Sequence, residues 1–366
     1  LGMMQTGTHI TYNPGPSQNH PRLSEFVHDA LDAGIPALSH RSQQFADIVA
    51  ETTANLRQLL DIPADYHVWF LASATEAMER IIENTVKRSS HHVVCGAFSQ
   101  RFATIAQELG KTVGVTPASA ADCHEVQNLK LPSDVELLAL THNETSNGTT
   151  LDADTLASIR QANPDVLIAL DLVSSTPIIP VDLAQVDMAF FSIQKAFGLP
   201  PGLAVLIASP RALGKARQLQ ASGQSIGSYH SFTELAKFAA KSYTPETPNT
   251  LAIYLLGRVA SDYLTQGLPQ IQDQLHHQAA QLYRAIDDHP HLKAIVAEQT
   301  HRSVTVIVAE VTGGNQTVID SLSRHGHQLG RGYAQHKTSH IRIANFPAHL
   351  GTTQDLVKHL EQWRHD

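Results

Sequence analysis

Short apolar segments alternate with amphipathic ones along most of the chain, and this alternation limits the fold more than any other feature. The apolar runs occupy residues 67–71, 91–95, 135–140, 166–170, 188–192 and 204–208. Segments with a helical spacing of apolar residues lie between them, among others at 76–88, 100–109 and 154–161. Because strands joined by helices pair in parallel, we expect an α/β fold with a mostly parallel sheet sandwiched by helices.

The residues before and after this region do not continue the alternation of short strands and helices. Helices are predicted at 22–33 and 43–60 before it, and a helical tract from Leu251 to about His289 follows a proline-rich loop at 243–249. The tail predicts a small α+β arrangement, with strands at 301–309 and 340–344 and helices at 315–325 and 353–364. Since 366 residues are many for one core, we expect two domains, residues 1–257 with the large sheet and residues 258–366 as a smaller carboxy-terminal α+β domain.

Composition excludes several classes of protein. A net charge of −8 disfavours nucleic acid as a partner, and no apolar run is long enough to predict a membrane span. Two cysteines, Cys95 and Cys123, are too few for disulfide bonds to stabilise a chain of this length. The sequence does not begin with the basic and then apolar residues of a signal peptide. We therefore expect a cytoplasmic protein. The 22 histidines show no convincing zinc spacing in the sequence, so we expect no metal.

Lys195 ends an apolar stretch and precedes a loop rich in glycine and proline. A lysine at the end of a buried strand has a lowered pKa, which frees its amine to form a Schiff base. Asp171 ends another apolar run, 24 residues earlier. A lysine that holds an aldehyde and an aspartate that keeps a ring nitrogen protonated are the minimum that pyridoxal phosphate requires. Taken alone, Lys195 is equally well interpreted as a surface lysine after a core strand.

Other polar clusters also follow predicted strands. Small residues at 72–76 open a helix whose N–H groups could bind the cofactor phosphate, although simple helix capping explains them equally well. Phe98 could stack on a planar ring or belong to the core. Residues 142–148 lie where parallel sheets bind ligands, or form an Asx-type turn.

Two arginines are candidates for binding anions. Arg41, beside His40, could grip a carboxylate or phosphate in a fork, or it could be a solvated residue before a helix. Arg342 lies within an apolar strand and needs an anionic partner, either a substrate carboxylate or a structural salt bridge.

Together these segments resemble the class V (fold-type I) pyridoxal phosphate aminotransferases, and most closely their phosphoserine aminotransferase branch. The resemblance runs from Asn13 to the carboxy terminus. It is carried by residues 13–16, 39–42, 143–145, Asp171 with Ser174 and Ser175, Gln194 with Lys195, and 198–203.

The resemblance implies a role for each matching residue. Lys195 would be the Schiff-base lysine, Asp171 would pair with the pyridine nitrogen, and Arg342 would hold the substrate α-carboxylate. The remaining cofactor contacts would be Ala74, Thr75 and Gln194 at the phosphate, Phe98 stacked on the ring and Thr145 near it. His40 and Arg41 would bind a substrate phosphate. Glu246 and Thr247 would reach the cofactor phosphate of the other subunit, which implies a homodimer with shared active sites.

The implied reaction moves an amino group between phosphoserine or glutamate and their keto acids, as in serine biosynthesis. Glu76 and Glu246 depart from the branch by placing negative charge near expected phosphate sites. The alternative is therefore a class V aminotransferase for alanine or serine with glyoxylate or pyruvate. A cysteine desulfurase would need a cysteine on a late loop, whereas both cysteines precede residue 124. A cofactor-binding regulatory module is the remaining alternative, and it predicts no spectral change with any amino acid.

Overall fold

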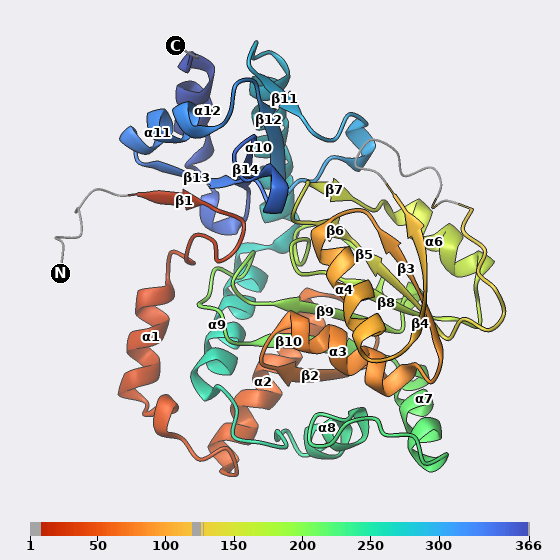
Figure 1. Cartoon of the computed structure of the whole chain (residues 1–366). Coiled ribbons are helices and arrows are strands. Elements are labelled where there is room, and N and C mark those ends of the chain that lie inside the picture. Colours follow the sequence, from red (N-terminus) through yellow and green to blue (C-terminus); the bar gives the residue numbers. More distant parts are fainter. Residues whose placement is uncertain (1–8, 119–125, 127, 365–366) are drawn as a thin grey trace.

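The central sheet of this computed structural model has seven strands in the order β2–β10–β9–β8–β5–β3–β4 (Figure 1). The structure describes residues 9–118, 126 and 128–364, so that Cys123 falls outside it. The strands are β2 (His67–Leu71), β3 (Ser89–Val94), β4 (Thr112–Pro117), β5 (Leu137–Thr141), β8 (Leu167–Asp171), β9 (Met188–Ser192) and β10 (Ala204–Ala208). The pairs from β4 through β9 are parallel, and only β10 runs against its neighbours. The expectation of a mostly parallel sheet is confirmed.

Helices cover both faces of this sheet. One face packs against α1 (Leu23–Asp32), α2 (Gln43–Leu59), α6 (Ala153–Ala162) and α9 (Thr250–Gln266), and the other against α3 (Ala74–Thr85), α4 (Ala97–Glu108), α7 (Pro210–Ala221) and α8 (Phe232–Ala239). Neighbouring residues of one strand join opposite cores, as Phe191 and Phe190 of β9 do. This is the period of two that a strand imposes, and it explains why the central strands β8, β9 and β10 are apolar almost throughout.

The helical tract after the proline-rich loop is two helices rather than one. α9 ends at Gln266 and α10 (Leu268–Asp287) begins after Gly267, which has a φ of 88°. A glycine with positive φ followed by proline at the start of the next helix breaks the tract. The predicted domain boundary at 257/258 lies inside α9, which packs along α2 in the first core. The division into two domains stays a prediction.

A second sheet is built from the two ends of the chain, in the order β1–β13–β14–β12–β11. Its strands are β1 (Ile10–Tyr12), β11 (Leu292–Ala294), β12 (Val306–Val311), β13 (His327–Arg331) and β14 (His340–Ala344). β1 pairs in parallel with β13, so the amino-terminal strand belongs to the sheet of the carboxy-terminal residues. Helices α10, α11 (Gln316–Arg324) and α12 (Thr353–Gln362) pack against it in a third core.

The strand expected at 301–309 begins only at Val306. Residues Gln299–His301 form a 3-10 turn, and the Ser303 hydroxyl accepts the N–H groups of Thr305 and Val306, 3.1 and 3.0 Å away. Local side-chain bonds of this kind compete with strand pairing. The remaining short elements are the hairpin β6 (Asn143–Glu144) with β7 (Thr149–Thr150) and the 3-10 turns Ile35–Ala37, Leu183–Gln185, Ala334–His336 and Pro347–His349.

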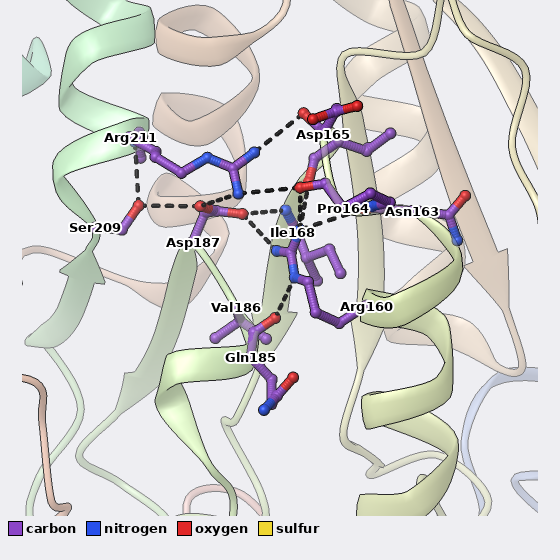
Figure 2. A network of polar contacts seen from close by, with 12 residues as sticks. Arg160, Asn163, Pro164, Asp165, Ile168, Gln185, Val186, Asp187, Ser209 and Arg211 are labelled. Atoms are coloured by element: carbon purple, nitrogen blue, oxygen red, sulfur yellow. Dashed lines mark hydrogen bonds and ion pairs between the residues drawn. The ribbon is translucent and has the colours of Figure 1, made fainter.

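A polar network joins the amino ends of β8 and β9 to the carboxyl end of the antiparallel strand β10 (Figure 2). Asp187, just before β9, accepts from Arg160 Nη2 at 2.6 Å and from the Ile168 N–H of β8 at 3.0 Å. The hydroxyl of Ser209, just after β10, donates to the same carboxylate at 3.2 Å. Asp187 and Arg160 are largely buried, so the charges are paired where water cannot screen them. Asp171 is the last residue of β8, so the network holds the strands together at the end opposite to Asp171.

No helix among the described residues is long and apolar enough to cross a membrane.

Candidate active site

Two oppositely charged side chains lie buried at the carboxyl ends of neighbouring strands. Asp171 is the last residue of β8, and Lys195 follows the end of β9. Burial, with the nearby charge of Glu144, raises the pKa of Asp171 to about 7, even though its Oδ1 accepts the Val173 N–H at 2.8 Å. Burial, reinforced by Arg342, lowers the pKa of Lys195 to about 8. Both groups therefore titrate near neutrality, where proton transfer is easiest.

The turn after β1 closes over the Lys195 amine. Lys195 Nζ donates to the Pro14 carbonyl at 2.7 Å. Gly15 lies so close that an added Cβ would collide with Nζ and approach Cε to 3.2 Å. The turn at 13–16, noted in the sequence, thus faces the reactive amine.

Aromatic rings form one wall beside this lysine. Phe98, at the start of α4, has its ring centroid 5.9 Å from Lys195 Nζ and 5.1 Å from the ring of Tyr333. Arg101 lies 5.0 Å over the Phe98 ring and donates to the Tyr333 hydroxyl at 3.2 Å. A planar ligand beside Lys195 would meet Phe98, as the sequence predicts.

Arg342 reaches this group from the second sheet. It lies in β14, and its Nε donates to the Arg331 carbonyl at 2.7 Å while Nη1 is 3.4 Å from the Thr145 carbonyl. Its guanidinium carbon is 5.6 Å from the centroid of the Tyr333 ring. Burial lowers the pKa of Arg342. The contact joins Arg342 to Thr145 of the large sheet region, and the remaining N–H groups of the guanidinium can donate to an anionic ligand.

Glu144 has a structural use that the sequence did not predict. Its carboxylate accepts the N–H groups of Phe98 and Ser99 at 3.1 and 3.0 Å, and the hydroxyls of Ser99 and Ser146 at 2.9 and 2.6 Å. These are the free donors of the α4 amino end, which Gly96 leaves without a side-chain cap. Glu144 thereby fixes the position of Phe98.

The amino end of α3 is partly capped and partly open. The Ser73 hydroxyl accepts the Glu76 N–H at 3.0 Å, and Glu76 Oε2 accepts the N–H of Ala72, the residue before the cap, at 2.8 Å. The N–H groups of Ala74 and Thr75 remain available for an anion such as phosphate. Thr75 Oγ1 also lies 3.4 Å from Arg101 Nη1, which links this helix end to the aromatic wall.

His230 joins the two acidic residues that stood out in the sequence. Its Nδ1 bonds Glu76 Oε1, and its Nε2 forms an ion pair with Glu246 Oε2 at 2.9 Å. Burial opposes the charge of His230, but the contacts with Glu246 and Glu76 outweigh it and raise the pKa to about 9. A protonated histidine therefore neutralises part of the acidic charge beside α3.

The predicted substrate residues His40 and Arg41 lie against the proline-rich loop. His40 Nδ1 is 3.3 Å from the Thr247 hydroxyl, and Arg41 donates to the carbonyls of Thr244 and Pro245 at 2.5 and 2.9 Å. Within the described part of the chain, no hydrogen bond, ion pair or ring contact joins His40 or Arg41 to Lys195. The structure thus brings His40, Arg41, Glu246 and Thr247 together as a second group, which we call the loop cluster.

The chain matches known proteins over nearly its whole length. The family model "Aminotransferase class-V" covers residues 12–341. This chain belongs to the class V aminotransferases. A phosphoserine aminotransferase from Cytophaga hutchinsonii has a TM-score of 0.95 and is 38% identical, with 98% of this chain and 99% of that chain covered. A phosphoserine aminotransferase of Rhodococcus opacus (strain B4) is 26% identical over 295 residues, which are 80% of this chain and 77% of the relative.

The fold is shared more widely among aminotransferases. An alanine–glyoxylate aminotransferase from Nostoc has a TM-score of 0.74 at 20% identity, with 99% of this chain and 97% of that chain covered. Membership of the family makes this protein a pyridoxal phosphate-dependent aminotransferase.

The residues around Lys195 fit the cofactor that class V aminotransferases use. Besides the amine, the carboxylate and the aromatic ring, two buried polar atoms, Gln194 Oε1 and Ser192 Oγ, have no hydrogen-bond partner within the described chain. Buried polar atoms without partners are costly unless a ligand or water satisfies them. Ser192 is the last residue of β9, and Gln194 immediately precedes Lys195.

Sequence reasoning missed three side chains of this region. Arg101 occupies the helix position one turn after Phe98, a spacing that could have indicated a shared face. Tyr333 and His230 lie in irregular segments far from the motifs, and no local pattern marks them. Their partners are distant in sequence, so only the fold identifies them.

Proposed function

We propose that this aminotransferase moves an amino group between phosphoserine or glutamate and their keto acids, a reaction of serine biosynthesis. The observation that carries the proposal is the full-length match, at 38% identity, to a protein described as a phosphoserine aminotransferase. Two separate anion-binding groups support it: the Arg342 guanidinium beside Lys195, and the Arg41 guanidinium with the His40 ring in the loop cluster. A substrate with a carboxylate at one end and a phosphate or second carboxylate at the other needs two such groups.

Lys195 is the proton carrier in this proposal. With its pKa lowered to about 8, about a tenth of the free amine is neutral at pH 7, far more than for an ordinary lysine, and can accept the proton from the substrate α-carbon. Pyridoxal phosphate, when bound, supplies an electron sink for the negative charge that develops there. Asp171 holds a proton on the ring nitrogen, because an adjacent cation favours the ionised carboxylate that burial alone disfavours.

The other residues bind and orient. Arg342 holds the substrate α-carboxylate, Phe98 stacks on the cofactor ring, and Thr145 fixes Arg342 through its carbonyl. Gln194 and the N–H groups of Ala74 and Thr75 bind the cofactor phosphate.

The loop cluster serves the site of a second subunit in this proposal. Glu246 and Thr247 complete the partner's phosphate site, and His40 and Arg41, which contact the same loop, act with them. A loop that completes the site of a second subunit requires a homodimer with shared active sites. The predicted cytoplasmic location stays a prediction.

One observation favours the alternative, an aminotransferase for alanine or serine with glyoxylate or pyruvate. Arg41 already donates to two backbone carbonyls, and Glu246 lies two residues beyond the first of them. A site in which Arg41 is committed to its own loop would bind only the α-carboxylate, through Arg342.

The test is a set of half-reactions. The yellow holoenzyme is mixed separately with phosphoserine, glutamate, serine and alanine, and its visible absorbance is followed. We expect rapid bleaching with phosphoserine and glutamate only, and an Arg41→Gln variant that loses this preference while Arg342→Gln reacts poorly with all four. Bleaching with alanine or serine but not phosphoserine would establish the alternative. No change with any amino acid would contradict both.

A further inference from the structure

Three side chains that can bind a metal meet in the second sheet region. His327 lies in β13, and Asp355 and His359 lie one turn apart on α12. His327 Nε2 is 3.1 Å from Asp355 Oδ2 and 3.2 Å from His359 Nδ1, and the last two atoms are 3.6 Å apart. His327 is buried, and its partners lie 28 and 32 residues away, so the spacing of histidines along the sequence does not reveal this group.

The triangle of donor atoms has the dimensions of one face of a tetrahedral metal site. With metal–ligand bonds of about 2.0–2.2 Å, neighbouring donors of tetrahedral zinc are about 3.3–3.6 Å apart. The three distances in the structure lie within about 0.2 Å of that range. Little movement would therefore be needed to place an ion at equal distance from all three donors.

We propose that His327, Asp355 and His359 bind a divalent metal ion of the zinc type, with water as the fourth ligand. Two imidazoles and one carboxylate are a ligand set that zinc accepts, whereas calcium and magnesium prefer oxygen ligands only. Asp355 is exposed, so an ion can enter from solvent. The ring of His325 stacks on that of His359 with centroids 3.9 Å apart, which limits rotation of this ligand.

A metal-free hydrogen-bond cluster is the competing explanation. The N–H of His327 Nε2 would then be shared between Asp355 and His359. His327 Nδ1 is buried and has no hydrogen-bond partner in the described chain, so the ring can carry its proton on Nδ1 and leave the lone pair of Nε2 for a metal. Only direct binding distinguishes the two states.

The position of the cluster indicates what the ion would do. His327 pairs with Ile10 of β1, and the turn after β1 contacts Lys195. An ion shared by β13 and α12 would fasten the terminal helix to the strand that holds the amino-terminal segment. Because it binds only the folded chain, it would raise the melting temperature without taking part in the reaction.

The test uses untagged holoenzyme, freed of metal and of unbound cofactor, and titrated with Co²⁺ and Zn²⁺. We expect one ion per chain, the visible bands of tetrahedral Co²⁺ at wavelengths beyond the cofactor absorbance, displacement by Zn²⁺, and a higher melting temperature. His359→Asn and Asp355→Asn should each weaken binding at least about tenfold, since loss of even an outer-shell partner can cost that much.

His277→Asn is the matched control. Asp273 and His277 on α10 have the same one-turn spacing and the same 3.6 Å separation as Asp355 and His359, and they are exposed. This substitution should leave Co²⁺ binding and its spectrum unchanged. Wild-type protein without tetrahedral Co²⁺ bands, or with binding that His277→Asn weakens as much as His359→Asn does, would overturn the proposal and leave the hydrogen-bond cluster.

Discussion

Burial is what makes Lys195 and Asp171 useful to the reaction. A charge on either side chain is disfavoured at the end of a buried strand, and the pKa values move toward each other, to about 8 and about 7. The same burial appears in the sequence as an apolar run before each residue, which is why both could be predicted. Tyr333 could not, because its importance comes from contacts across the fold, such as the hydrogen bond from Arg101.

The close approach of Gly15 to Lys195 predicts a local effect of adding one methyl group. Gly15→Ala should push the Lys195 amine aside and lower kcat at least about tenfold, because small misplacements of reacting groups are costly. The control is Gly214→Ala in α7, where an added Cβ meets nothing within 4 Å. Steady-state kinetics and melting temperatures check this. Equal kcat in the two variants would contradict the proposed placement of Lys195.

Among the helices and strands, those buried on both faces were the most predictable. β2, β9 and β10 have the predicted bounds, because an uninterrupted apolar run leaves no other explanation. β4 was missed because its residues are at least partly exposed and polar residues interrupt its short apolar pattern, which ends in a proline. The break between α9 and α10 depends on Gly267, and a single glycine within an apolar pattern is a weak signal.

The contacts of His230 with Glu76 and Glu246 predict how the affinity for the cofactor depends on pH. Its pKa is raised from 6.5 to about 9, so its stabilising effect is complete below pH 6.5 and is lost as the pH rises through about 9. Above that pH, the negative charges of Glu76 and Glu246 are no longer offset beside the proposed phosphate site. We expect the dissociation constant for pyridoxal phosphate, measured by fluorescence, to rise roughly tenfold or more across this range.

Variants separate this effect from other ionisations. His230→Gln should bind the cofactor weakly even at pH 7, and adding Glu246→Gln should restore part of the affinity by removing the second negative charge. Arg80, which acts on Glu76, and His40, which lies near Glu246, stay unchanged in both. If the dissociation constant of His230→Gln depends on pH as that of the wild type does, the contacts of His230 with the two glutamates do not affect the phosphate site.

The Asp187 network predicts a loss of stability without a loss of chemistry (Figure 2). Asp187→Ala leaves the charge of Arg160 and the Ile168 N–H without their partner and should cost about 3–5 kcal/mol. Lys237→Ala breaks an exposed pair with Glu234 and should cost at most about 1 kcal/mol. Denaturant unfolding compares the two variants. A lowered kcat in folded Asp187→Ala would contradict a purely structural role.

In the molecule as a whole, the amino-terminal segment connects both sheets. β1 pairs with β13 in the second sheet, the next turn contacts Lys195, and α1 packs into the core of the first sheet. Arg342 makes a second connection between the two sheets: it lies in β14 of the second sheet and contacts the Thr145 carbonyl beside the first. The sequence could not predict that β1 joins the second sheet, because a three-residue strand pairing with residues more than 300 positions away has no local pattern.

Shared active sites predict complementation between two inactive variants. Lys195→Ala and Arg41→Ala should each be almost inactive with phosphoserine, but a mixed dimer would contain one site with neither substitution. After random exchange of subunits, activity should recover to about a quarter of the wild-type value. Mixed protein that stays as inactive as its parents would mean that Arg41 acts on the Lys195 of its own chain.

The most direct test of the proposed mechanism is to find which lysine carries the cofactor. The holoenzyme is reduced with borohydride, which fixes the bond between pyridoxal phosphate and its lysine, and the digested chain is mapped by mass spectrometry. We expect the added phosphopyridoxyl mass on the peptide that contains Lys195 and on no other. The same mass on a different lysine, or on none, would contradict the mechanism.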